Sequence, residues 1–143
     1  MAEPSLYLFD GFNLLHAGGY ADPSTLVDHL ASFVAARGAR GVIVFDGAGE
    51  ERAVGPLSVR YAQHADSLLE RLAAEHRQRE VVCIVSSDSA IRAASGQEVR
   101  KATSAGFLSE LSAEGHAERR SSPVRDRLDE KTLAKLEKLR RGE

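Results

Sequence analysis

Four aspartates stand where an apolar run ends or a helical pattern begins. Asp10 closes SLYLFD, Asp46 closes VIVFD, Asp66 opens ADSLLE and Asp88 closes VVCIVSSD. In an open α/β sheet, the carboxyl ends of the parallel strands face one crevice, and ligands bind there. Four carboxylates meeting in that crevice repel each other strongly unless a divalent cation offsets their charge. The spacing therefore predicts a metal-dependent site.

Magnesium or manganese suits such a site, because both prefer oxygen ligands and bind through a few carboxylates plus substrate phosphate. The bound ion polarises a phosphoryl oxygen and activates water as a nucleophile. Asp10 is the first choice of ligand, and Asp88 ends another strand. Asp66 stands at a helix start, where capping is its alternative role. Any one of these aspartates is explained by a turn or a cap, but the four together favour a site.

Polar residues beside these aspartates extend the candidate site. Asn13 follows Asp10 by three residues, and its amide can orient a water or bind a phosphate oxygen, with helix capping as the alternative. Ser86 and Ser87 precede Asp88 and can donate hydrogen bonds to phosphate or to Asp10. Plain turn and cap roles explain the two serines equally well.

The elements that must position these side chains alternate between strand and helix. Apolar runs predict strands at 6–9, 42–45 and 81–85, a short edge strand at 57–61 and a further strand near 98–102. Helical spacing predicts helices from Pro23, over 65–77, 90–94 and 104–112, and residues 47–56 read as a loop. This alternation predicts a parallel sheet with right-handed crossovers.

Composition and charge limit the classes of protein to which this chain can belong. The 143 residues, 43% apolar and 28% charged, suit one soluble domain, and no apolar run is long enough to span a membrane. We expect a cytoplasmic protein, because no signal-peptide pattern opens the chain. Cys83 lies in an apolar run and is expected to be buried, and one cysteine with scattered histidines excludes a zinc site.

The last 25 residues differ from the rest. Residues 1–118 carry 10 basic and 16 acidic side chains, whereas residues 119–143 carry 9 basic and 5 acidic ones. We therefore expect a domain over 1–118 and a basic, helix-prone tail over 119–143, with disorder in part of it as an alternative. RRSSPV at 119–124 reads as a linker. A basic tail favours a polyanionic partner such as RNA, although a solvated helix explains it too.

The order of these motifs resembles that of the YacP-like NYN-domain ribonucleases, within the PIN-like nuclease group. The similar stretches lie within residues 5–112 and read DGFNLL, VIVFDG, ADSLLE, IVSSD and GQEVRKATSAGFLSEL. The resemblance implies a PIN-like three-layer α/β/α sandwich with a central, mostly parallel sheet. It also implies a metal-dependent endoribonuclease that uses Mg²⁺ or Mn²⁺, with translating ribosomes as a place where it meets RNA.

The resemblance also implies roles for single residues. Asp10 and Asp66 are the expected essential metal-binding carboxylates, supported by Asp88 as a third ligand and by Asn13, while Asp46 is expected farther from the metal. Arg100 and Lys101 are expected to meet the RNA backbone, with plain surface positions as the alternative. Hydrolysis by an activated water leaves a 5′-phosphate and a 3′-hydroxyl.

Other functions stay open at this stage. The family often has a second carboxylate after the third motif's aspartate, where this chain has Ser67, and Glu70 one turn on is a substitute. A catalytically weak or inactive RNA- or ribosome-binding module of the same fold is therefore the main alternative. An aspartyl-phosphate phosphatase usually needs an aspartate where Phe12 stands. His16 and His64 lie nearest the motifs but have no partner histidine at a telling spacing. Oligomeric state is left open.

Overall fold

The computed structural model describes residues 3–121, with side chains through residue 113. The chain divides between Ser109 and Glu110 into two units, and the account below concerns the first. The strands are β1 Leu6–Asp10, β2 Arg40–Asp46, β3 Arg52–Val54, β4 Leu57–Ala62, β5 Val82–Val85 and β6 Arg100–Ala102. The helices are α1 Gly11–Ala17, α2 Pro23–Ala36, α3 Ala65–His76, α4 Ser89–Ala94 and α5 Ser104–Ser121.

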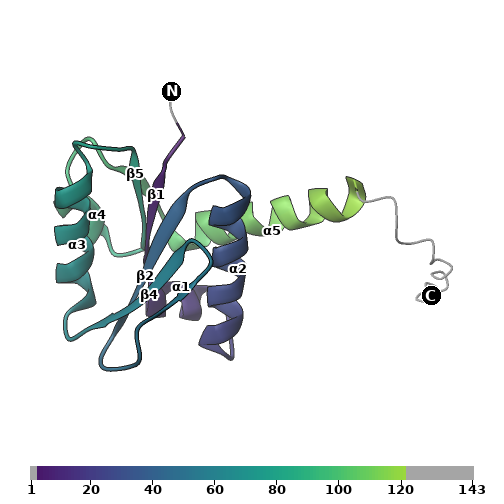
Figure 1. Ribbon diagram of the computed structural model, residues 1–143, viewed down its shortest axis with the longest axis horizontal. Coiled ribbons are helices and arrows are strands. Elements are labelled where there is room, and N and C mark those ends of the chain that lie inside the picture. The colour runs from purple at the N-terminus through teal and green to yellow at the C-terminus, as the bar shows by residue number, and fades with distance from the viewer. Residues whose placement is uncertain (1–2, 122–143) are drawn as a thin grey trace, which may run out of the picture. The chain divides into compact units, whose positions relative to one another are not determined.

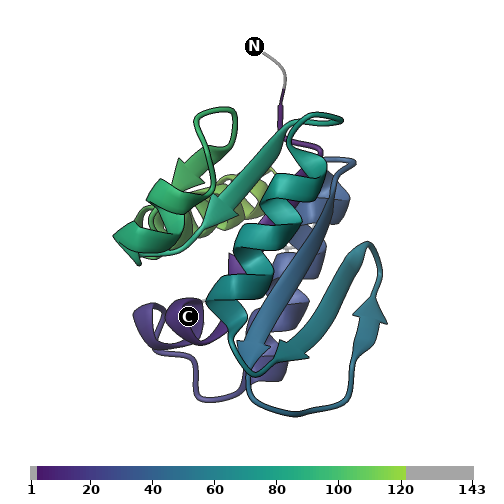
Figure 2. The same ribbon diagram turned by 90° about the vertical axis from the view of Figure 1, so that its left-hand side faces the viewer.

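The strands form one six-stranded sheet in the order β3-β4-β2-β1-β5-β6 (Figure 2). All neighbouring pairs are parallel except β3 and β4, which are antiparallel. From β1 the chain first adds β2 and β4 on one side, and later β5 and β6 on the other. The strand order therefore reverses between β1 and β5, which is where open α/β sheets bind ligands.

Helices cover both faces of the sheet (Figure 1). On one face, Leu6 and Leu8 of β1 pack in a core cluster with Leu68, Leu69 and Leu72 of α3. On the other face, the Tyr7 ring contacts Phe33 of α2, and Phe9 contacts Phe107 near the start of α5. Parallel strands covered on both faces read as continuous apolar runs, which explains the sequence of β1 and β5. The predicted three-layer α/β/α arrangement with a mostly parallel sheet is confirmed.

Two predicted elements need correction. Residues 47–56 are not all loop, because Arg52–Val54 pairs with β4 through a turn at Gly55, whose φ is +58°. The strand from Leu57 is therefore not at the edge but lies between β2 and β3. A three-residue strand containing an arginine carries almost no periodic signal, and its pairing with β4 determines its conformation.

The predicted helix at 104–112 continues to Ser121, so residues 119–121 of the predicted linker are helical. The remainder of the predicted 119–143 tail lies outside the described residues, and the predicted boundary at 118 stays a prediction. Cys83 is buried in β5, as expected. Within residues 3–121, no helix has the length and apolar character needed to cross a membrane.

Candidate active site

The candidate site lies where β1 and β5 end side by side. Asp10 is the last residue of β1, and the pairing of Phe9 with Val85 places Ser86 next to it. The Ser86 hydroxyl donates to Asp10 Oδ2 at 2.8 Å and accepts the backbone N–H of Asp88 at 3.0 Å. Ser86 is fully buried. It thus links the carboxylate of β1 to the loop that starts α4, across the strand-order reversal.

Asn13 makes a second connection across the same point. Its Oδ1 accepts the backbone N–H of Ser87 at 2.9 Å and the hydroxyl of Ser104 at the start of α5. The Ser87 hydroxyl in turn accepts the backbone N–H of Ser104 at 3.2 Å. A backbone N–H can only donate, so these contacts use the oxygen of the Asn13 amide and not its NH₂ group. The predicted role of Asn13 toward water or phosphate stays a prediction.

Asp10 carries charge in an unfavourable environment. The carboxylate is half-buried, and burial is the main cause that raises its pKa. The hydrogen bonds from Ser86 and the Asn13 backbone lower the pKa, while the negative charges of Asp46 and Asp88 raise it further. Burial and these two negative charges outweigh the two hydrogen bonds, so the pKa of Asp10 lies above its ordinary value of 3.8. Asp10, Asp46 and Asp88 therefore share one negative field that a cation would relieve.

Asp46 and Asp88 also stabilise the starts of two helices. Asp46 Oδ1 accepts the backbone N–H of Ala65 at 2.9 Å, at the first residue of α3. Asp88 is the N-cap of α4 and accepts the backbone N–H of Ala90 at 2.9 Å. Each carboxylate satisfies one free N–H group of a helix start with one oxygen.

Asp66 lies at the start of α3. It is exposed in the first turn of that helix, and its Oδ1 accepts the N–H of Ser67 at 2.9 Å. No three of the described His, Cys, Asp and Glu side chains come close enough together to hold a metal ion. The donor set fits an ion such as Mg²⁺, which one or two carboxylates bind together with water and substrate phosphate. The predicted ligation by Asp10, Asp66 and Asp88 stays a prediction.

The backbone of Arg100 and Lys101 lies before the carboxyl ends of the strands, where the candidate site is. They pair with Cys83 and Ile84 of β5, which align with Tyr7 and Leu8 of β1. A strand rises about 3.3 Å per residue, so the backbone of Arg100 lies about 10 Å before the level of Asp10 along the strands, and that of Lys101 about 7 Å. The Lys101 ammonium donates to the carbonyl oxygens of Gly96 and Val99. These two bonds hold the Lys101 ammonium near its own strand, and contact of Arg100 and Lys101 with RNA stays a prediction.

Ser104 is the residue that the sequence analysis missed. It is fully buried and contacts Asn13 and Ser87, although the helical pattern marked it only as a helix start. The signal was available, because Ser104 stands two residues after β6, as Ser87 stands two residues after β5. The same strand-end argument applied to the last parallel strand would have included it.

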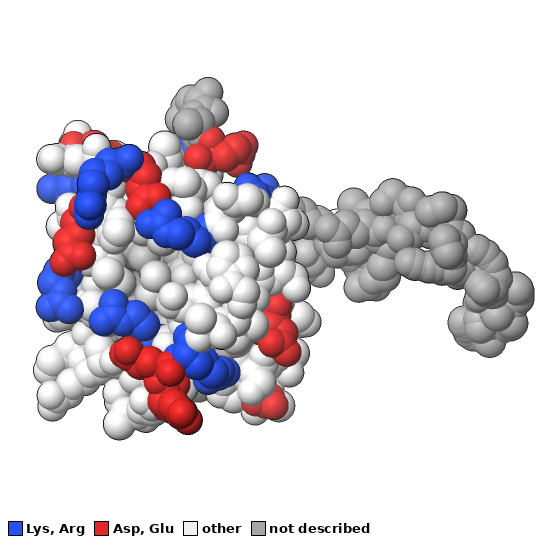
Figure 3. All heavy atoms as spheres, in the orientation of Figure 1, with Lys and Arg blue, Asp and Glu red and all other residues white. Residues whose placement is uncertain are grey.

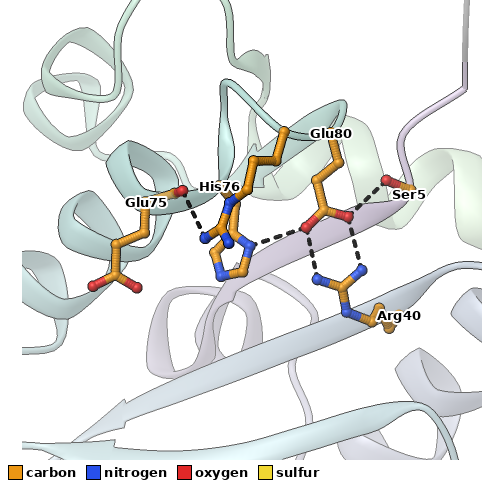
Figure 4. A network of polar contacts seen from close by, with 6 residues as sticks. Ser5, Arg40, Glu75, His76 and Glu80 are labelled. Atoms are coloured by element: carbon orange, nitrogen blue, oxygen red, sulfur yellow. Dashed lines mark hydrogen bonds and ion pairs between the residues drawn. The ribbon is translucent and has the colours of Figure 1, made fainter.

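A second polar cluster lies at the opposite end of the sheet (Figure 4). The Glu80 carboxylate accepts two hydrogen bonds from Arg40 at 2.7 Å, one from Ser5 at 2.9 Å, and contacts His76 Nδ1 at 2.9 Å. The hydrogen bonds from Arg40 are the main cause that lowers the pKa of Glu80 to about 2. This cluster links the starts of β1 and β2 to the segment before β5, and its charges are paired.

A cavity of about 240 Å³ lies near this cluster, between α3 and the β2–β4 part of the sheet. Its walls are largely apolar, and they also include the side chains of Arg40, Arg60 and His76. Arg60 faces Glu51 at 3.7 Å. Basic and acidic side chains alternate over the face shown in Figure 3. The cavity holds no carboxylate to bind a metal, so the strand-end site is the better candidate for phosphodiester chemistry.

Comparison with known proteins supports the fold. The model of the family described as YacP-like NYN domain matches residues 7–141, well past the last recognisable motif. A crystal structure of Rae1 (YacP) from Bacillus subtilis is 24% identical, with a TM-score of 0.67 over 96% of this chain and 95% of that one. Its W164L mutant gives 24% identity and a TM-score of 0.63, covering 81% and 80%.

No curated protein matches the sequence. The likeness to the Rae1 structures shows a shared PIN-like fold. The family model covers most of the chain. The chain therefore belongs to the YacP-like NYN domain family.

Proposed function

We propose that the protein is a metal-dependent endoribonuclease that hydrolyses RNA phosphodiester bonds where β1 and β5 end. The observation that carries this proposal is Asp10, a half-buried carboxylate at the strand-order reversal. Burial and the charges of Asp46 and Asp88 raise its pKa. Carboxylates kept together in this way favour a divalent cation. Membership of the YacP-like NYN family supports RNA as the substrate class.

Each residue has a distinct part in this proposal. Asp10 and Asp66 would hold Mg²⁺ or Mn²⁺, with Asp88 bound directly or through water. The ion supplies a polarised phosphoryl oxygen and an activated water. Ser86 holds the Asp10 carboxylate through its 2.8 Å hydrogen bond and lowers its pKa. Asn13 contributes its amide NH₂ group toward the phosphate or the attacking water.

The cellular setting is also a proposal. We propose messenger RNA on the ribosome, in the cytoplasm, as the substrate, with Arg100, Lys101 and the basic residues of 119–143 contacting the RNA backbone. The charge contrast between residues 1–118 and 119–143 supports a polyanionic partner.

A binding module without turnover is the second candidate. It is favoured by Ser67, which stands where the family often has a carboxylate, and by the lack of a three-residue metal group among the described side chains. Such a protein binds RNA with or without manganese and leaves it intact.

Cleavage of a single-stranded RNA with added Mn²⁺ tests the two candidates. A nuclease cuts the RNA, Asp10→Asn abolishes cutting, and EDTA stops it. Asp28→Asn is the matched control, because it removes an exposed aspartate on α2. RNA binding without manganese-dependent cutting supports the binding module. Equal cutting by the unmodified protein and Asp10→Asn sinks the nuclease proposal.

A further inference from the structure

Phe12 is the large apolar side chain that stands exposed on the described surface, with 37% of its area accessible. It is the second residue of α1 and follows Asp10 by two positions. Two residues span at most about 7 Å of backbone, so the ring is attached within one nucleotide's reach of Asp10. A single exposed apolar residue is common on protein surfaces. Its position at the candidate site is what makes this one informative.

The fold braces the ring on one side. An added Cβ at Gly11 would lie 2.5 Å from Phe45 Cδ1, so glycine there lets α1 lie directly on Phe45. The Phe12 ring then packs edge-to-face on Phe45, with centroids 5.1 Å apart and planes at 69°. Phe45 is buried and in turn stacks with Tyr61 at 5.6 Å. The exposed ring is therefore supported by an aromatic row from β2 and β4.

We propose that Phe12 forms a base-stacking subsite for the nucleotide next to the phosphate held at Asp10. Single-stranded RNA is recognised through unstacked bases that lie on aromatic side chains, and this contact tolerates any base. A braced ring loses little side-chain freedom on binding. His16, one helical turn further on, lies 6.5 Å from Phe12 between ring centroids and borders the same subsite. This inference rests on the proposed action on RNA.

The chain contains no tryptophan, so Phe12→Trp introduces a single fluorescent reporter at the subsite. Binding of a short single-stranded oligoribonucleotide is measured with Mn²⁺ in variants that also carry Asp10→Asn. That substitution prevents cutting during the measurement. Phe12→Trp keeps the affinity, and its fluorescence is quenched by RNA. Phe12→Leu and Phe12→Ala weaken binding about five- to hundred-fold, with a smaller loss for double-stranded RNA.

Phe12→Leu separates stacking from packing, because leucine still covers Phe45 while it lacks an aromatic face. Its thermal midpoint is expected to stay close to that of the parent. Tyr20→Leu is the control, because Tyr20 is a partly exposed aromatic that bonds His29. Unchanged RNA affinity of Phe12→Leu, with Asp10-dependent cutting intact in the unmodified protein, overturns the inference and leaves the proposed function standing. Absence of both RNA binding and cutting overturns both.

Discussion

The two ends of the central sheet treat their carboxylates in opposite ways. At the carboxyl ends of the strands, burial and neighbouring aspartates raise the pKa of Asp10. At the amino ends, Arg40, Ser5 and His76 surround Glu80, and the pKa of that carboxyl falls to about 2. At the first end, negative charges act on the Asp10 carboxylate, whereas at the second the Arg40 guanidinium pairs with the Glu80 carboxylate.

This difference separates function from stability. A fully paired carboxylate stabilises the fold, because its charged form is better solvated in the folded chain than in water. A buried carboxylate without a cation destabilises the fold, and such sites are retained where they bind or react. We therefore expect substitutions at the two ends to affect activity and stability in opposite patterns.

The largest expected effect is on cleavage. Asp10→Asn is expected to reduce manganese-dependent RNA cutting about a hundred- to a thousand-fold or more, because it removes a charge that binds the ion. Glu80→Gln should cut RNA at nearly the parent rate under conditions where both are folded. Gel-based initial rates test the pair, and a comparable loss in both variants would contradict the separation.

Ser86→Ala is expected to reduce the same rate about ten-fold, since residues that orient a metal ligand typically contribute ten- to hundred-fold. The substitution removes the 2.8 Å hydrogen bond to Asp10 and leaves the carboxylate in place. Titration with Mn²⁺ should show a higher metal concentration at half-maximal rate. An unchanged metal dependence would assign Ser86 to structure alone.

Glu80→Gln is expected to lower the free energy of unfolding at pH 7 by about 1–2 kcal/mol, through loss of the charged hydrogen bonds from Arg40. The folded pKa of Glu80, about 2, lies below its ordinary value of 4.5. Its stabilisation is therefore present above pH 4.5 and is lost as the pH falls toward 2. Denaturant unfolding at pH 7 and pH 2.5 should show the difference between parent and variant shrinking.

The smallest effect is a gain in stability for Asp10→Asn without metal, about 1–2 °C in the thermal midpoint at pH 7. The folded pKa of Asp10 lies above its ordinary value of 3.8, so its charge destabilises the fold at neutral pH. That penalty is relieved as the pH falls below the folded pKa and disappears below 3.8. Added Mn²⁺ should raise the midpoint of the parent only. A less stable variant at pH 7 would contradict the contrast between the two ends.

Much of the candidate site could be predicted because the strand-end argument is local. Asp10 and Ser86 each follow an apolar run, and their 2.8 Å contact needs only a parallel pairing of two buried strands. Register was harder to predict. Arg100 and Lys101 lie within the last motif, yet their pairing with Cys83 and Ile84 places their backbone three and two residues before the row of Asp10.

The types and order of the residues determined the α/β class, the buried strands and the presence of carboxylates at their ends, because apolar periodicity and strand termination are local properties. The tertiary structure alone decided which carboxylates share a field. It brought Asp46 and Asp88 close enough to act on Asp10, and it paired Arg52–Val54 with β4 in the sheet. Distances between side chains on different strands depend on strand order and register, which long-range packing sets.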